Sequence, residues 1–209
     1  MTALIRVGQI EHNSLIYGPY SRTVVWTKGC DLACKGCWNK DLWPSVGGEI
    51  IEVKSIVDKA IDSGDEGITI LGGEPLQQAS STLALIMNAQ QRGLGVFLYT
   101  GYELKELDGD GLRCYQSSDI VVAGRYVEDQ RDTNLRWRGS TNQIVEFKTD
   151  RYKEFEFSEG NEIQITIDED GSLTILGYPD EALVQELLDR ELSADAKGRI
   201  GPSSQPFSE

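Results

Sequence analysis

The chain has 209 residues, and 39% of them are apolar, which is enough to bury a core and excludes disorder over its whole length. Its formal net charge of −14 argues against sequence-independent binding to nucleic acid, because acidic surfaces repel phosphate backbones. No apolar run is long enough to span a membrane. The first residues include Arg6 and Glu11, so we expect no signal peptide there.

Apolar strand-like runs alternate with helical segments over the first 149 residues. The pattern predicts strands at 23–28, 68–71, 96–99, 120–123 and 144–147, and helices at 53–63 and 76–92. Short strands that are apolar throughout and separated by helices indicate an α/β fold around a parallel sheet. The segments that follow such strands meet beyond their carboxyl ends. We expect one rim to gather residues 29–37, 72–75, 100–102 and 124–126.

The composition changes near Asp150. From this residue to the end there are 15 acidic and 5 basic residues, a net charge of −10. Segments 162–167 and 172–176 alternate in polarity around a glycine-containing turn, which predicts a β-hairpin, and residues 179–192 have helical spacing. We therefore expect a main domain at 1–149, an acidic appendage at 150–195 and a flexible tail at 196–209. The acidity predicts either a solvated face or a surface that steers a basic partner.

Three of the four cysteines, Cys30, Cys34 and Cys37, lie within eight residues. Clustered thiols are typical of metal or redox sites in reducing compartments, so we expect a cytoplasmic protein. Three thiolates on one loop can hold an iron–sulfur cubane with one iron left open. The main alternative is tetrahedral zinc with Cys114 or His12 as the fourth ligand. Apart from that alternative, we expect Cys114 to pack in a helix and His12 to have no acid–base role.

The cysteine loop, GCDLACKGCWNKDLW, resembles the cluster loop of radical S-adenosylmethionine (SAM) enzymes. It is most similar to that of the activating enzymes of anaerobic ribonucleotide reductase. Further segments resemble motifs of this family in the same order, namely Gly72–Pro75, Tyr99–Tyr102, Val122–Tyr126 and Trp137–Gln143. Two features depart from the family. Tyr20 replaces the third residue of its usual Gly-Pro-Gly, and the chain after Asp150 continues beyond the end of compact members.

The resemblance implies a partial (β/α)6 barrel of the radical SAM type with a C-terminal β-hairpin and helix appended. It also implies a 4Fe-4S cluster held by Cys30, Cys34 and Cys37, and SAM bound at its open iron. The SAM contacts that it implies come from the cysteine loop and two strand ends, namely Gly36, Trp38, Gly72, Gly73, Glu74 and Thr100. Side chains that would position SAM or a docked glycine loop, or else form surface ion pairs, are Arg125, Arg138 and Asn142. No side chain is expected to be catalytic itself, because the cofactors carry the chemistry.

In function, the resemblance implies a radical SAM oxidoreductase that generates a glycyl radical on a partner such as anaerobic ribonucleotide reductase. A flavodoxin or ferredoxin would be its reductant. Two alternatives stay open. One is a radical SAM enzyme that acts on a small molecule or peptide, with residues 150–209 completing or covering the substrate site. The other is a non-enzymatic zinc or cluster module that binds a partner through its acidic appendage.

Overall fold

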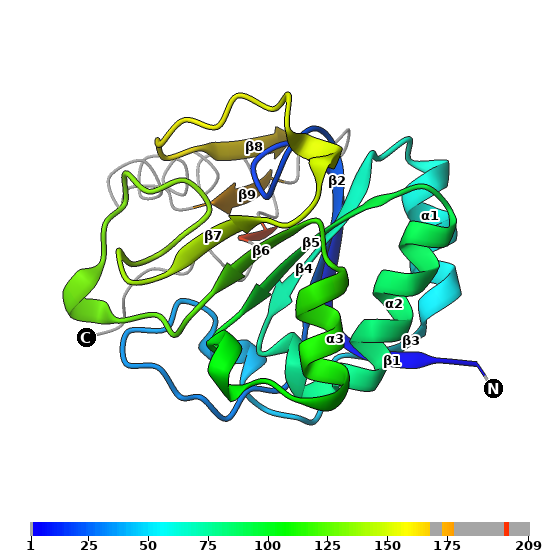
Figure 1. The fold of residues 1–209 in the computed structure, drawn as a ribbon, viewed down its shortest axis with the longest axis horizontal. Coiled ribbons are helices and arrows are strands. Elements are labelled where there is room, and N and C mark those ends of the chain that lie inside the picture. Colours follow the sequence, from blue (N-terminus) through cyan, green and yellow to red (C-terminus); the bar gives the residue numbers. More distant parts are fainter. Residues whose placement is uncertain (1, 168–172, 178–198, 201–209) are drawn as a thin grey trace.

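The structure is a computed structural model that describes residues 2–167, 173–177 and 199–200 (Figure 1). Within these residues a seven-stranded sheet has the order β3-β1-β2-β4-β5-β6-β7, and a smaller sheet has the order β10-β9-β8. The strands are β1 (Leu4–Ser14), β2 (Arg22–Thr27), β3 (Glu49–Glu52), β4 (Gly67–Gly72), β5 (Gly95–Thr100), β6 (Ile120–Ala123), β7 (Ile144–Phe147), β8 (Ile163–Ile167), β9 (Leu173–Gly177) and β10 (Arg199–Ile200). The α-helices are α1 (Val53–Asp62), α2 (Ala79–Gln91) and α3 (Gly109–Ser117).

The centre of the large sheet is parallel. Strands β2, β4, β5 and β6 are neighbours and run in the same direction, whereas β1 and β7 pair antiparallel at either side of this group. The α/β class and the five predicted strands are therefore confirmed. The expected partial (β/α)6 barrel is not confirmed, because the group of neighbouring parallel strands in the described residues has four members. Strand β3 pairs antiparallel with β1 at the other edge.

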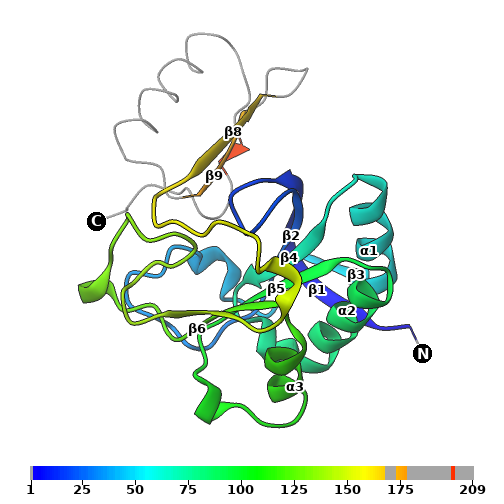
Figure 2. The same ribbon diagram turned by 45° about the horizontal axis from the view of Figure 1, so that its top comes forward.

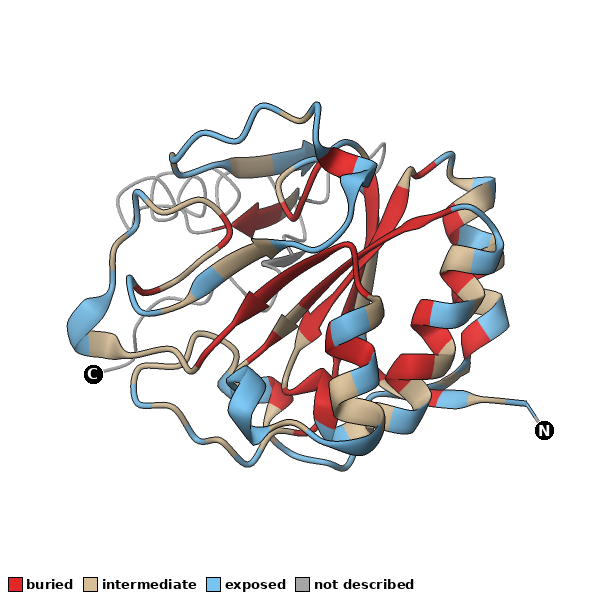
Figure 3. Ribbon diagram, in the orientation of Figure 1, coloured by how far each residue is buried: buried red, intermediate tan, exposed pale blue. Residues whose placement is uncertain are grey.

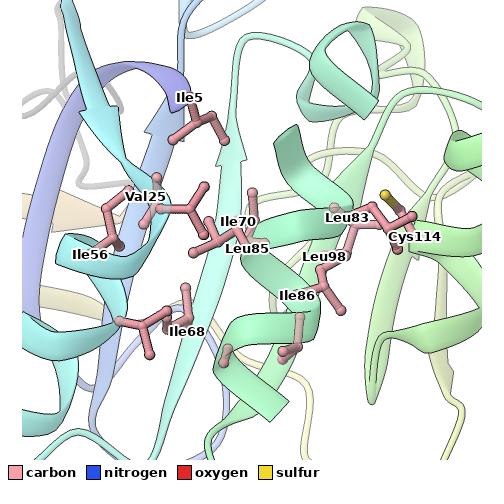
Figure 4. Packing of buried hydrophobic residues seen from close by; sticks show 14 of the residues in the cluster. Ile5, Val25, Ile56, Ile68, Ile70, Leu83, Leu85, Ile86, Leu98 and Cys114 are labelled. Carbon is pink, nitrogen blue, oxygen red and sulfur yellow. The ribbon is translucent and has the colours of Figure 1, made fainter. Parts of the chain in front are cut away.

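The three α-helices lie on one face of the large sheet (Figures 1 and 3). Their apolar stripes meet side chains from alternate strand positions, so that Ile56 and Leu85 pack in one cluster with Ile70 (Figure 4). Every residue of strand β2 is buried, on both faces, including the polar Arg22, Thr23 and Thr27. On the face away from the helices a second cluster contains Trp26 and Leu71. This second face is the one on which the site is built.

The chain after Asp150 shares its core with the rest of the molecule. Tyr152 is 2% exposed and packs in a cluster with Phe97, and Leu176 packs with Trp26. Strands β8 and β9 pair antiparallel at the positions of the predicted hairpin (Figure 2). The turn at 168–172 and the predicted helix at 179–192 lie outside the described residues. Two residues of the predicted tail form β10, parallel to β9.

Candidate functional site

A cavity of about 190 Å³ lies beyond the carboxyl ends of the parallel strands. Its wall is made by the cysteine loop that follows β2 and by the segments that follow β4, β5 and β6. The cavity is lined by every residue that the sequence predicted to hold a cluster or SAM, namely Cys30, Cys34, Gly36, Cys37, Trp38, Gly72, Gly73, Glu74 and Thr100. The predicted convergence of the strand ends on one rim is therefore a property of the fold.

The cysteine loop is held by its own backbone. The amide of Cys30 donates to the carbonyl of Trp43 at 2.9 Å, and the amide of Cys37 donates to the carbonyl of Cys34 at 3.1 Å. The indole Nε1 of Trp43 also donates to Sγ of Cys37 at 3.4 Å. All three thiols are free and half-buried. The loop therefore presents three sulfurs to one cavity without a disulfide.

Burial raises the pKa of the Cys30 and Cys34 thiols, and the neighbouring thiols and Glu74 add smaller effects in the same direction. Without a metal these groups keep their protons. A metal that binds them must displace those protons, so its affinity rises with pH. Only a cation that binds thiolates strongly can therefore displace the protons of these thiols at neutral pH.

The thiols suit an iron–sulfur cluster better than a single metal ion. In the part of the chain that the structure describes, no group of three or more His, Cys, Asp or Glu side chains is close enough to hold one ion. A 4Fe-4S cluster binds each thiolate through a different iron, so its protein sulfurs stand farther apart than the ligands of one zinc. The two residues expected as a fourth zinc ligand, Cys114 and His12, do not line the cavity. Cys114 is buried in α3, and His12 on β1 forms a hydrogen bond with Thr23 on β2.

Glu74 is the buried charge of the site, with 1% of its surface exposed. Its Oε1 accepts from the Leu76 amide and from the Thr100 hydroxyl, both at 2.9 Å, and its Oε2 accepts from the Gly101 amide at 2.7 Å. Burial is the largest effect and raises the pKa of this carboxyl to about 7, although all three hydrogen bonds lower it. Glu74 thereby joins the ends of β4 and β5.

The two glycines before Glu74 allow parts of this chain to approach one another. A Cβ on Gly72, which has a φ of 117°, would lie 2.5 Å from the backbone nitrogen of Thr27. A Cβ on Gly73 would lie 2.4 Å from the carbonyl oxygen of Gly29. Both positions therefore need glycine so that the end of β4 packs against β2 and the start of the cysteine loop.

The loop after β6 contributes residues that the sequence did not single out. The guanidinium of Arg131 lies over the Trp38 ring, 5.5 Å from its centroid, and Arg136 also lines the cavity. Of the three polar residues predicted in this region, Arg138 lines the cavity. Arg125 instead pairs with Glu106 at 2.7 Å, and Asn142 donates to the carbonyl of Arg125. The signal that points to Arg131 and Arg136 is their position after a parallel strand.

The C-terminal segment completes the cavity wall through Gly160, Asn161, Glu162 and Gly177. This segment runs past the loop that follows β6 before it enters β8 (Figure 2). On its far side the amide of Gly177 donates to the Tyr17 hydroxyl at 3.2 Å. The sequence left open that residues 150–209 complete or cover the substrate site, but no motif singled out these four residues.

A sheet with one cysteine loop at its carboxyl rim defines a protein of the single-cluster iron–sulfur class. The family model of the 4Fe-4S single cluster domain matches residues 16–146, which is more than half of the chain. The chain therefore belongs to this family. The resemblance seen in the cysteine loop is confirmed at a finer level by curated relatives, each named anaerobic ribonucleoside-triphosphate reductase-activating protein, and the chain is a member of that family of activating proteins.

Three of these relatives come from two bacteria and a phage. The protein of Salmonella typhimurium is 35% identical and that of Escherichia coli is 33% identical, each over 141 residues, or 63% of this chain and 91% of the relative. The protein of enterobacteria phage T4 is 30% identical over 65% of this chain and 89% of its own. Among solved structures, QueE from Escherichia coli aligns over 94% of this chain and 93% of its own, with 9% identity and a TM-score of 0.44. That structural likeness is too low to carry a functional argument.

Proposed function

We propose that this protein activates an anaerobic ribonucleoside-triphosphate reductase by radical SAM chemistry, generating a glycyl radical on that partner. One observation supports the proposal most directly. The three free thiols of the cysteine loop line the same cavity as the buried carboxylate of Glu74. The names of the curated relatives point to the same partner.

In this proposal Cys30, Cys34 and Cys37 hold a 4Fe-4S cluster, and the free thiols at one cavity fit that donor set. When bound, the cluster supplies one electron for the reductive cleavage of SAM to methionine and a 5′-deoxyadenosyl radical, which abstracts a Cα hydrogen from a glycine. The indole of Trp43, which donates to Sγ of Cys37, stabilises negative charge on that sulfur.

The chain's own residues would orient SAM. Glu74 uses three acceptor positions for Leu76, Thr100 and Gly101, and an ionised carboxylate has about four. One acceptor position is left over, and because Glu74 lines the cavity, its carboxylate can accept from an ammonium group bound there. Trp38, held under the Arg131 guanidinium, offers an aromatic surface for a base. Gly36 would supply backbone contact.

A second candidate is a radical SAM enzyme that acts on a small molecule or a peptide. It is favoured by residues 160–162, which line the cavity but lie beyond the matched family region that ends at residue 146. A structural zinc module is disfavoured, since neither Cys114 nor His12 lines the cavity. No helix of the described segments is long and apolar enough to cross a membrane. We further propose a cytoplasmic location and a flavodoxin or ferredoxin as reductant.

The test is anaerobic reconstitution with iron and sulfide, followed by reduction in the presence of SAM and a purified anaerobic ribonucleotide reductase. We expect about four irons per chain, 5′-deoxyadenosine, and a glycyl radical signal on the reductase by electron paramagnetic resonance. 5′-Deoxyadenosine without a glycyl radical on any such reductase would instead support the second candidate. Absence of both iron binding and SAM cleavage would refute the proposal.

Cysteine variants provide the matched control. Replacing Cys30, Cys34 or Cys37 by Ala should each abolish the cluster's visible absorption and its iron. Cys114→Ala should retain both, because this thiol is fully buried in α3 away from the cavity. Equal loss of iron in the Cys114 variant would contradict the three-thiolate site.

A further inference from the structure

Two arginines of the cavity wall are held by acids from the C-terminal segment. Atom Nη2 of Arg136 lies 2.9 Å from both carboxylate oxygens of Glu162, and its backbone amide donates to Glu159 at 2.7 Å. Nη2 of Arg138 also donates to Glu159. The two guanidinium groups are mostly buried, with 13% and 19% of their side chains exposed. They therefore form one pair of cationic groups that faces two carboxylates.

Each of these guanidinium groups has an N–H donor without a hydrogen-bond partner among the described residues. The Nε atoms of Arg136 and Arg138 are both buried and have no hydrogen-bond partner among the described residues. A buried donor without an acceptor costs free energy, and a guanidinium binds a carboxylate best through two parallel N–H groups. Both side chains line the cavity. The pair can therefore bind a carboxylate through Nε together with an Nη, whereas the two carboxylates now paired with it bond only Nη2 of each arginine side chain.

The two carboxylates that pair with these arginines can exchange them for water. Glu159 and Glu162 are about half exposed, at 45% and 41%, so water can replace the arginines as their partners. They lie beyond residue 146, where the family match ends, whereas both arginines lie inside it. The cationic pair thus lies in the region that the 4Fe-4S single cluster domain model matches, and its occupants lie in the segment after that region.

The cavity is also small for a polypeptide. At about 190 Å³ it is smaller than the roughly 300 Å³ of ordinary small-ligand pockets. A polypeptide segment gains room there when part of the wall moves aside. The segment at 159–162 is held there by the half-exposed ion pairs, whereas the strand-end walls are held by buried contacts such as that between Glu74 and Thr100.

We propose that Arg136 and Arg138 form a receptor for the carboxylate side chains of an incoming polypeptide, and that Glu159 and Glu162 occupy this receptor in the resting protein. The inference rests on the proposed function only in taking the substrate to be a polypeptide. Acids of the same chain act at a local concentration of the order of millimolar, so they lower the apparent affinity for any acidic segment. Only a polypeptide segment whose own acidic side chains displace Glu159 and Glu162 can enter the cavity.

The test uses the cluster-loaded, full-length protein and two fluorescein-labelled peptides of glycine, one with two glutamates spaced as Glu159 and Glu162 are, the other with two glutamines. The variant Glu159→Gln/Glu162→Gln should bind the glutamate peptide about tenfold more tightly than the wild type at low salt, with no change for the glutamine peptide. Glu154→Gln/Glu156→Gln changes exposed acids of the same segment outside these ion pairs and should have no effect.

Hydrogen exchange gives a second measurement on the unmodified protein. Saturating glutamate peptide should accelerate exchange of the backbone amides in 153–167, because it displaces this segment, and the glutamine peptide should not. Equal affinity of the wild type and the variant for the glutamate peptide would overturn the proposal. So would a gain that glutarate, a small dicarboxylate, competes away as strongly as the peptide does, because the receptor would then take small carboxylates. Peptide binding needs no radical chemistry, so it is independent of whether SAM cleavage is found.

Discussion

The hydroxyl of Thr100 donates a hydrogen bond of 2.9 Å to the buried carboxylate of Glu74. This contact joins the ends of two neighbouring parallel strands, β4 and β5, at the cavity that the cysteine loop also lines. The carboxyl group is nevertheless poorly solvated there, and burial raises its pKa to about 7. The charge of Glu74 is therefore poised to change near neutral pH, with consequences for stability.

The first prediction is that Glu74 makes the metal-free protein less stable as pH rises from about 4.5 to 7. In the unfolded chain the carboxyl ionises near its ordinary value of 4.5, whereas in the folded chain it keeps its proton to about 7. Between these values ionisation favours the unfolded state. The free energy of unfolding of the wild type relative to Glu74→Gln should fall across this window by at most about 3 kcal/mol.

Urea denaturation under reducing conditions at several pH values measures this difference. The glutamine variant does not titrate at this position, so the other acidic groups cancel in the comparison. Parallel stability curves for the two proteins between pH 4.5 and 7 would show that the pKa of Glu74 is ordinary.

The second prediction concerns Trp43, whose Nε1 donates to Sγ of Cys37 at 3.4 Å. Reduction of a bound cluster adds negative charge to its sulfurs, and a donor stabilises that charge. Trp43→Phe keeps an aromatic ring at this position but removes the indole N–H donor. Losing one such bond, worth about 0.5–1 kcal/mol, should lower the reduction potential by roughly 20–45 mV.

Anaerobic redox titration followed by electron paramagnetic resonance gives the potential, and iron analysis checks that the cluster is retained. Trp26→Phe is a suitable control, because Trp26 is fully buried in β2 and does not line the cavity. An unchanged potential in Trp43→Phe with full iron content would mean that this donor does not reach the cluster sulfur.

The third prediction concerns Tyr20, which replaces the glycine of the related motif. Its φ is 58°, in the left-handed region where a side chain costs about 1 kcal/mol and glycine costs none. The ring offsets this cost in part by packing 5.9 Å from the ring of Phe155 and 6.4 Å from that of Tyr152. Tyr20→Gly should therefore be more stable than Tyr20→Ala by about 1 kcal/mol, the reverse of the usual order of these residues.

Thermal or urea unfolding of the two variants makes the comparison directly, since both lack the aromatic ring. The reverse order, with the alanine variant more stable, would mean that the backbone at this position relaxes to a negative φ.

The parts of the site that the sequence predicted share one physical origin. Cys30 and Glu74 follow parallel strands and Thr100 ends one, and the ends of neighbouring parallel strands meet whatever the loops contain. Such residues are located by local periodicity alone. The pairing of Arg136 with Glu162 was not predictable in this way, because it joins residues from two loops that no strand register brings together.

In the fold, too, local periodicity predicted some strands and missed others. The strands at the centre of the sheet were predicted because they are apolar throughout, whereas β1 and β3 were missed. Strand β3, EIIE, is short, exposed and at the edge, and β1 mixes polar with apolar residues. The six parallel strands of a (β/α)6 barrel were implied by resemblance and not by any residue pattern. The described chain instead closes the parallel group with the antiparallel strands β1 and β7.

The last prediction is that the chain after Asp150 is required for stability. The Tyr152 hydroxyl accepts from the Arg22 guanidinium at 2.8 Å and donates to Glu66 at 2.7 Å, and the Arg22 side chain is fully buried. Tyr152→Phe removes these bonds and should cost about 1–2 kcal/mol. Truncation after Thr149 also removes the Tyr152 ring and the buried Leu176, so it should cost more than about 3 kcal/mol. Urea denaturation measures both effects, and Lys153→Ala, an exposed neighbour, should change stability by less than about 0.5 kcal/mol. A truncated chain that unfolds at the same urea concentration as the full-length protein would show that this segment is an independent appendage, as its composition alone suggests.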